Sequence, residues 1–103
     1  MKIGFGLVTT FHAHMGEGKA LAAIILEAGS ILEEIPSCLE YFVGVSEEDT
    51  DRVTVFEMWA DEGHHKASLE NHEIRTIIQR AEPLIQKIER NEPLEMLNGE
   101  DYS

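Results

Sequence analysis

The sequence has one cysteine, no long hydrophobic run and few basic residues. A single thiol cannot form an internal disulfide, and it cannot form a cluster of thiolate metal ligands alone. We interpret Cys38, at the head of an apparent strand, as a small buried residue rather than a reactive thiol. No apolar stretch approaches the roughly 20 residues that a membrane-spanning helix needs.

The shortage of basic residues restricts the partners that the chain can bind. Twenty Asp and Glu residues against eight Lys and Arg residues give a formal net charge of −12. Such a charge repels phosphate backbones and anionic membranes, so we expect neither nucleic acid nor a membrane as a partner. The first residues, MKIGFGLVTTFHAHMGEGK, make a poor signal peptide because glycines interrupt a short apolar run, and we expect a cytoplasmic location.

The length and the residue pattern predict one domain over residues 1–103, with residues 99–103 as a flexible tail. Alternating apolar residues predict strands over 2–12, 38–46 and 52–60, and a short closing strand over 93–97. An apolar stripe at helical spacing predicts a helix over 20–34, and residues 62–90 suit a short and a longer helix broken near 71–73. This order predicts an α+β, ferredoxin-like βαββαβ fold, with helices on one face of a four-stranded antiparallel sheet.

Both faces of the third predicted strand are apolar. Val53 and Val55 lie on the face that the helices should cover, and Phe56 and Met58 lie on the other. One layer of two helices covers one face of a sheet, so a second copy of the chain is expected to cover the other. We therefore predict a homodimer with its sheets packed face to face.

The histidines give only a weak indication of a metal site. His12 and His14 share one side of a strand end, as His-x-His metal ligands do, but alternation places any two such residues on one side. His64 and His65 are neighbours and point about 100° apart on a helix, so they cannot share one ion. The familiar zinc pair on a helix is four residues apart with a glutamate beside the first histidine, and the chain has no such pair. We expect no metal site, and we interpret His64 and His65 as solvated. Nucleotide-binding glycine loops and the serine nucleophile motif are also missing.

Glu57 and Trp59 share the face of the strand that packs under the helices. A buried carboxylate needs partners, and an indole offers a flat wall with one N–H donor. Core filling and a pocket role are equally open for Trp59, whereas Glu57 is better explained as a structural carboxylate than as a base.

Residues 36–85 then carry a resemblance to a known family. Pro36, Cys38 and Leu39 form a turn into a strand, Glu57 and Trp59 end a later strand, and AEPL at residues 81–84 ends the last helix. This ordered set resembles the antibiotic biosynthesis monooxygenase (ABM) family, whose members form dimeric α+β barrels. Two positions depart from the family pattern. Ser37 replaces a turn glycine, and Ser68 stands where a histidine is common. A contribution of that histidine to substrate binding or proton transfer in quinol oxidation would be absent here.

The resemblance implies a monooxygenase that needs no metal, flavin or haem and acts on a quinol or a hydroxylated aromatic molecule. His72 or His65 would then be the base. The substrate pocket would be lined by Trp59, Glu57, Phe5, Phe11 and Tyr41.

Two alternatives remain. The chain could be a non-catalytic dimeric barrel that binds a small apolar ligand, for instance in a stress response. A haem-binding or haem-degrading relative is disfavoured, because the first strand has no asparagine and no histidine follows His72.

Overall fold

The computed structural model describes residues 4–97. Its elements follow in the order β1 (Gly4–Ala13), α1 (Gly18–Leu32), β2 (Cys38–Val45), β3 (Arg52–Trp59), α2 (Glu62–Ser68), α3 (His72–Ala81), a 3-10 turn η1 (Glu82–Leu84), β4 (Ile85–Arg90) and β5 (Leu94–Met96). The tail predicted over residues 99–103 lies outside the described residues. Within residues 4–97, no helix combines the length and the hydropathy needed to cross a bilayer.

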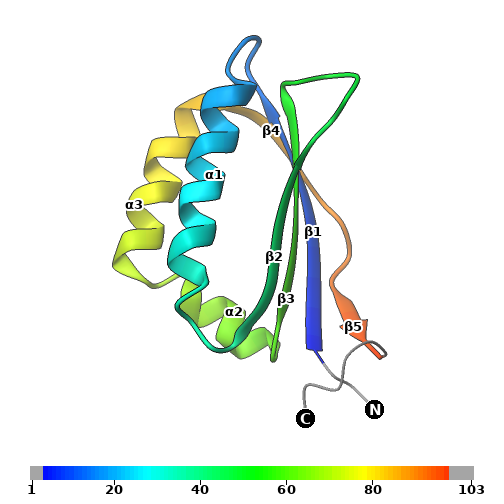
Figure 1. The fold of residues 1–103 in the computed structure, drawn as a ribbon, viewed down its shortest axis with the longest axis vertical. Coiled ribbons are helices and arrows are strands. Elements are labelled where there is room, and N and C mark those ends of the chain that lie inside the picture. The colour runs from blue at the N-terminus through cyan, green and yellow to red at the C-terminus, as the bar shows by residue number, and fades with distance from the viewer. Residues whose placement is uncertain (1–3, 98–103) are drawn as a thin grey trace.

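The strands form one antiparallel sheet in the order β2-β3-β1-β4, and β5 pairs with β1. The helices all lie on one side of this sheet (Figure 1). The predicted α+β, ferredoxin-like arrangement is therefore confirmed. The closing strand predicted over residues 93–97 is β5, whereas β4 was not expected.

The core lies between the sheet and the helices, as the alternation in β3 predicts. Val53, Val55 and Trp59 point toward the helices and are at most 2% exposed. Val53 and Val55 belong to one buried cluster with Leu21 and Ile25 of α1. Trp59 belongs to a second buried cluster, together with Phe5, Leu32 and Ile74.

The start of α1 is held against the loop before β3. The Asp51 carboxylate accepts hydrogen bonds from the backbone N–H groups of Gly16 and Gly18 at 3.0 and 2.9 Å. A Cβ atom on Gly18 would lie 1.9 Å from the Thr50 carbonyl oxygen, so this close approach requires glycine. The contact fixes where α1 begins over the sheet.

The break between the two later helices lies where the sequence predicts it. Asn71 caps α3 by accepting a hydrogen bond from the Ile74 N–H at 3.1 Å, and Asp61 caps α2 by accepting one from the His64 N–H at 2.8 Å. These caps turn the chain twice and place α2 against the end of β3.

The prediction that residues 85–90 continue a helix was wrong, because they form β4. Ile85 and Ile88 are three residues apart, which is a helical spacing. In the structure, Gln86 of β4 is an extra residue opposite His12 and Ala13 of β1, and this bulge shifts the register so that Ala13 pairs with Ile85 and Phe11 pairs with Ile88. The bulge brings both isoleucines to the helix-covered face and thereby imitates a helical pattern.

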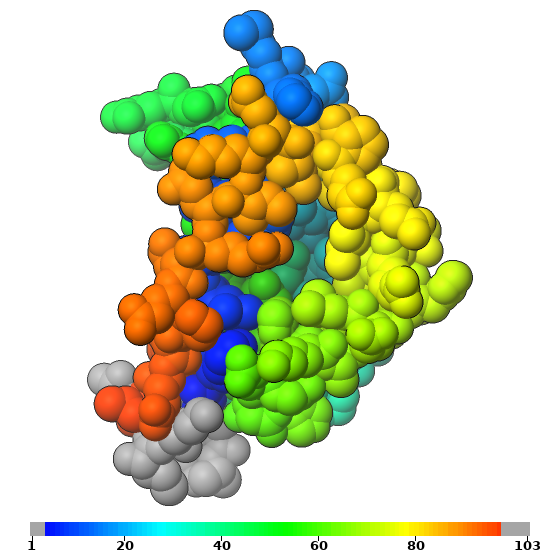
Figure 2. Space-filling model, turned by 180° about the vertical axis from the view of Figure 1, so that it is seen from behind, coloured from blue at the N-terminus to red at the C-terminus, as the bar shows by residue number. Residues whose placement is uncertain are grey.

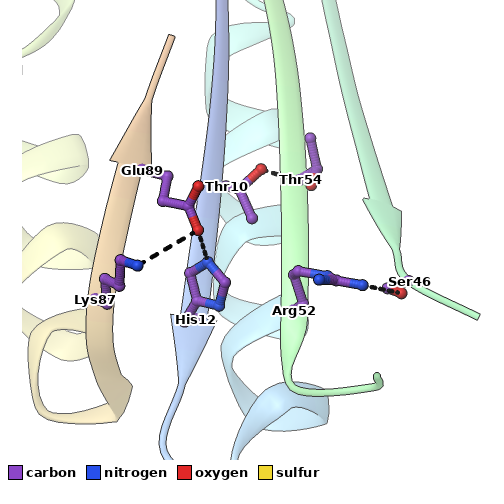
Figure 3. A network of polar contacts seen from close by, with 7 residues as sticks. All are labelled: Thr10, His12, Ser46, Arg52, Thr54, Lys87 and Glu89. Atoms are coloured by element: carbon purple, nitrogen blue, oxygen red, sulfur yellow. Dashed lines mark hydrogen bonds and ion pairs between the residues drawn. The ribbon is translucent and has the colours of Figure 1, made fainter. Parts of the chain in front are cut away.

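The other face of the sheet has no layer over it among the described residues. Its apolar part contains Phe42 and Phe56, whose rings stack with centroids 6.3 Å apart, together with Met58, Leu94 and Met96. Phe42 is 58% exposed. Its polar part, shown in Figure 3, contains the His12–Glu89–Lys87 contacts and the Thr10–Thr54 and Arg52–Ser46 hydrogen bonds.

Candidate active site

A cavity of about 600 Å³ lies between the inner face of the sheet and the helices. Figure 2 shows the surface hollowed between β4, in orange, and α3, in yellow, with β1 in blue at depth. Most of the wall is apolar, and it includes Leu7, Phe11, Ile25, Val55, Ile77 and Ile88. The volume lies within the range of about 300–1,000 Å³ that is usual for small-molecule sites.

One row of residues across the sheet supplies polar groups to this cavity. Tyr41 pairs with Glu57 and Glu57 pairs with Leu7, so the three side chains lie side by side on the inner face. The Trp59 indole N–H donates a hydrogen bond of 3.0 Å to Oε1 of Glu57. Because residues two apart on a strand share a face, this bond holds the carboxylate on the helix-covered side.

The Glu57 charge influences its neighbours. Burial, with the negative charge of Glu57 adding to it, raises the pKa of the Tyr41 hydroxyl well above its usual range. Burial and the same carboxylate, with a further contribution from Glu40, raise the pKa of the Cys38 thiol from its ordinary value of 9.0 to about 11. Tyr41 and Cys38 are therefore protonated at neutral pH. The Tyr41 hydroxyl donates to the Ile25 carbonyl oxygen at 3.4 Å.

Helix α2 contributes His65 and Ser68 to the cavity wall. The His65 ring packs against Phe5 at 5.9 Å and against the edge of Trp59 at 5.7 Å between centroids. Ser68 is buried, and its hydroxyl donates to the His65 carbonyl oxygen at 2.6 Å. An imidazole thus lies at the same end of the fold as the Glu57 carboxylate.

The site can be compared with known proteins. A family model described as antibiotic biosynthesis monooxygenase matches residues 4–80. The chain belongs to this family. No curated protein matches the chain.

Solved structures of several other proteins have the same fold. A candidate antibiotic biosynthesis monooxygenase from Chloroflexus aurantiacus is 30% identical, with a TM-score of 0.85 over 97% of this chain and 99% of that one. A candidate from Nitrosomonas europaea has a TM-score of 0.87 at 10% identity, over 94% and 93% of the two chains. A protein from Pseudomonas aeruginosa has a TM-score of 0.85 at 19% identity, over 95% and 98%. The family match supports a monooxygenase-like function in general terms.

The structure brings some of the expected ABM site residues together. Glu57, Tyr41, Phe11 and His65 all line the cavity. Trp59 is 0% exposed and Phe5 is 9% exposed, and neither is among the lining residues. They form the layer behind Glu57 and His65.

His72 takes a different place. It is an exposed residue at the start of α3 and does not line the cavity. His64 is also exposed, and its ring contacts Asp61 at 2.8 Å. His65 is therefore the histidine that faces the cavity among the three in this segment.

Several residues that line the cavity were not predicted from the sequence. Arg90, Asn91 and Pro93 border the cavity where the chain leaves β4. They were missed because residues 85–90 were interpreted as helical, so the sequence pattern gave no sign that this segment edges the site.

Within residues 4–97, no group of three or more His, Cys, Asp or Glu side chains is placed to hold a metal ion. The polar groups of the cavity wall include the Glu57 carboxylate, the Tyr41 phenol, the His65 imidazole and the Ser68 hydroxyl, with Arg90 and Asn91 near the end of β4. Such groups can donate and accept hydrogen bonds beside an apolar space.

Proposed function

We propose that this protein is a cofactor-independent monooxygenase that oxidises a quinol or hydroxylated aromatic molecule in the cavity. One observation carries the proposal, namely that the Glu57 carboxylate faces a largely apolar cavity and is held by the Trp59 N–H. An apolar wall takes up an aromatic ring, and a fixed acceptor selects for a hydroxyl group on it.

Glu57 is the base in this scheme. It accepts the proton of the substrate hydroxyl, and the resulting phenolate is electron-rich enough to give one electron to O₂. The two radicals join, forming a C–O bond to a ring carbon that carries hydrogen. That carbon then loses its proton while the O–O bond breaks. The net change converts one C–H group and O₂ into C=O and one water, and the phenol becomes a quinone.

His65 is the second proton carrier. It lines the cavity on α2, near the end of β3 that carries Glu57, and its ring is positioned by Phe5 and Trp59. An imidazole has one nitrogen that accepts a proton and one that donates a proton, so it suits the step in which the departing oxygen atom leaves as water. Tyr41 stays protonated, and its ring forms part of the wall.

We also propose that a second copy of the chain covers the open face of the sheet. The exposed apolar side chains of Phe42, which stacks on Phe56, and of Leu94 on this face support this, because exposed apolar surface of this kind often marks an interface. The polar contacts in Figure 3 would then surround the apolar centre, as the rim of an interface does.

Oxygen uptake with a panel of quinols and hydroxylated aromatic compounds tests the proposed chemistry. The wild-type protein should consume O₂ above the spontaneous rate with at least one compound. Glu57→Gln should lower that rate by about 100-fold or more while the compound still binds. Binding without oxygen uptake in the wild type would instead support the non-catalytic ligand-binding barrel.

A further inference from the structure

Arg90 is the one lysine or arginine among the residues that line the cavity. It ends β4, where it pairs with Thr9 of β1, so its side chain is on the helix-covered face. No hydrogen bond or ion pair of its side chain occurs within residues 4–97, although the chain has more than twice as many acidic as basic residues.

The backbone around Arg90 is fixed. The ladder between β1 and β4 holds Arg90 opposite Thr9, and the next residue, Asn91, donates its backbone N–H to the Val8 carbonyl oxygen at 3.1 Å. Asn91 and Pro93 also line the cavity. Arg90 and Asn91 therefore line the same side of the cavity, where the chain leaves β4, and Figure 2 shows the surface hollowed between β4 and α3.

The strand register gives the separation between Arg90 and Glu57. Arg90 and Val55 both pair with Thr9, while Glu57 pairs with Leu7. Their Cα atoms are thus two strands apart, about 10 Å, and two residues along, about 7 Å. Both side chains are on the helix-covered face and line the cavity, so a substituted ring system can bridge the distance between them.

We propose that the substrate carries a carboxylate, which Arg90 binds while the substrate's hydroxyl group reaches Glu57. This inference rests on the proposed function for the role of the hydroxyl. A guanidinium group pairs with a carboxylate through two parallel hydrogen bonds, and the Asn91 amide adds a third donor. Two fixed points of opposite charge, Arg90 and Glu57, then set which end of the substrate enters first.

Arg90 places a local positive charge at the cavity of a protein whose net charge is strongly negative. A net charge of −12, with Glu57 and Glu82 in the cavity wall, repels an anionic substrate from the site. A carboxylate would enter where a local positive charge offsets that repulsion. Arg90 lies at this point, and the acidic substrate is then oriented with its negative end away from Glu57.

Two acids, 2,5-dihydroxybenzoate and 1,4-dihydroxy-2-naphthoate, and their methyl esters serve as probes. Their dissociation constants are measured by quenching of Trp59 fluorescence under argon, and their oxidation is followed as O₂ uptake. The variants are Arg90→Gln and the control Arg75→Gln. Arg75 is an exposed arginine of α3, with no side-chain partner within residues 4–97, that does not line the cavity.

At least one acid should bind the wild type more tightly than its ester. Arg90→Gln should weaken binding of that acid by about tenfold or more and change binding of the ester little, and Arg75→Gln should change neither. The inference is overturned if acid and ester bind alike, if Arg90→Gln weakens both equally, or if no acid binds.

The two proposals fail separately. Binding of an acid that depends on Arg90 without any O₂ uptake keeps the carboxylate site and removes the monooxygenase. Uptake of O₂ with an ester as fast as with its acid, in the wild type and in Arg90→Gln, keeps the monooxygenase and removes the carboxylate site.

Discussion

The indole N–H of Trp59 donates a hydrogen bond of 3.0 Å to the Glu57 carboxylate from two residues along the same strand. Trp59 is fully buried, whereas Glu57 borders the cavity. The tryptophan therefore acts from behind the wall. It holds the carboxylate toward the apolar space without contacting a ligand there, which makes it a positioning residue.

Replacing Trp59 with phenylalanine should lower both stability and turnover. The smaller ring leaves a void and the carboxylate loses its donor, so we expect a loss of about 1–3 kcal/mol in the free energy of unfolding, measured with urea. We also expect kcat to fall by about 10- to 100-fold, because the base is no longer held in place. Val53→Ala is the control. It leaves a void in the other buried cluster on the same strand, and it should lower stability while kcat stays near the wild-type value, because Val53 does not line the cavity.

Substitutions of His65 and His72 should have different effects on activity, because His65 lines the cavity and His72 does not. His65→Phe keeps a ring against Phe5 and Trp59 but removes the nitrogen atoms, and oxygen uptake should fall by about tenfold or more. His72→Phe should leave the rate within about twofold of the wild type, because His72 is exposed and lies off the cavity. A loss in His72→Phe equal to that in His65→Phe would move the proton carrier to α3.

Cys38 should react slowly with iodoacetamide at neutral pH and faster as the pH rises. The thiolate is the reactive form and the pKa of Cys38 is about 11, so the rate should rise about tenfold per pH unit between pH 8 and 10. Glu57→Gln should speed alkylation at pH 8 more than Glu40→Gln does, because Glu57 contributes the larger charge effect. A rate that levels off below pH 9 would show that the thiol is not perturbed in this way.

The same raised pKa has a consequence for stability. Between pH 9.0 and about 11 the folded protein keeps the Cys38 proton that the unfolded chain releases. The folded state then binds more protons, so the free energy of unfolding should decrease as the pH rises through this range. Cys38→Ser should reduce that decrease in urea titrations at pH 9 and 11.

The open face of the sheet should hold two copies together. Phe42→Asp places a charge in the apolar patch, and sedimentation should show a shift from dimer to monomer at micromolar concentration. Leu26→Asp on α1 is the matched control, because Leu26 is 59% exposed and Phe42 58%. A wild-type protein that sediments as a monomer would contradict the proposal that a second copy covers this face of the sheet.

Much of the fold could be predicted because its alternating and helical patterns are undisturbed. The inner face of β3, with Val53, Val55 and Trp59, follows directly from period-two spacing. The element β4 could not be predicted, because a bulge at Gln86 turns Ile85 and Ile88, which are three residues apart, to one face. A bulge depends on pairing with a distant strand, and no local pattern in residues 85–90 reports it.

The candidate site was predictable to a similar extent. Glu57, Tyr41 and Phe11 face the cavity because strand alternation fixes their side. Which histidine faces it depends on how α2 rotates about the Asp61 cap, and that rotation is set by packing of His65 on two aromatic rings. Arg90 was not predicted to line the cavity, because β4 was not predicted to be a strand.

The fate of molecular oxygen tests the central claim most directly. The wild-type protein is mixed with its best quinol or hydroxylated aromatic substrate under ¹⁸O₂, and the product is analysed by mass spectrometry. We predict one ¹⁸O atom in each quinone formed and the second in water, with Glu57→Gln forming no product above the spontaneous background. A product without ¹⁸O, or equal labelling with Glu57→Gln, would contradict monooxygenation by this site.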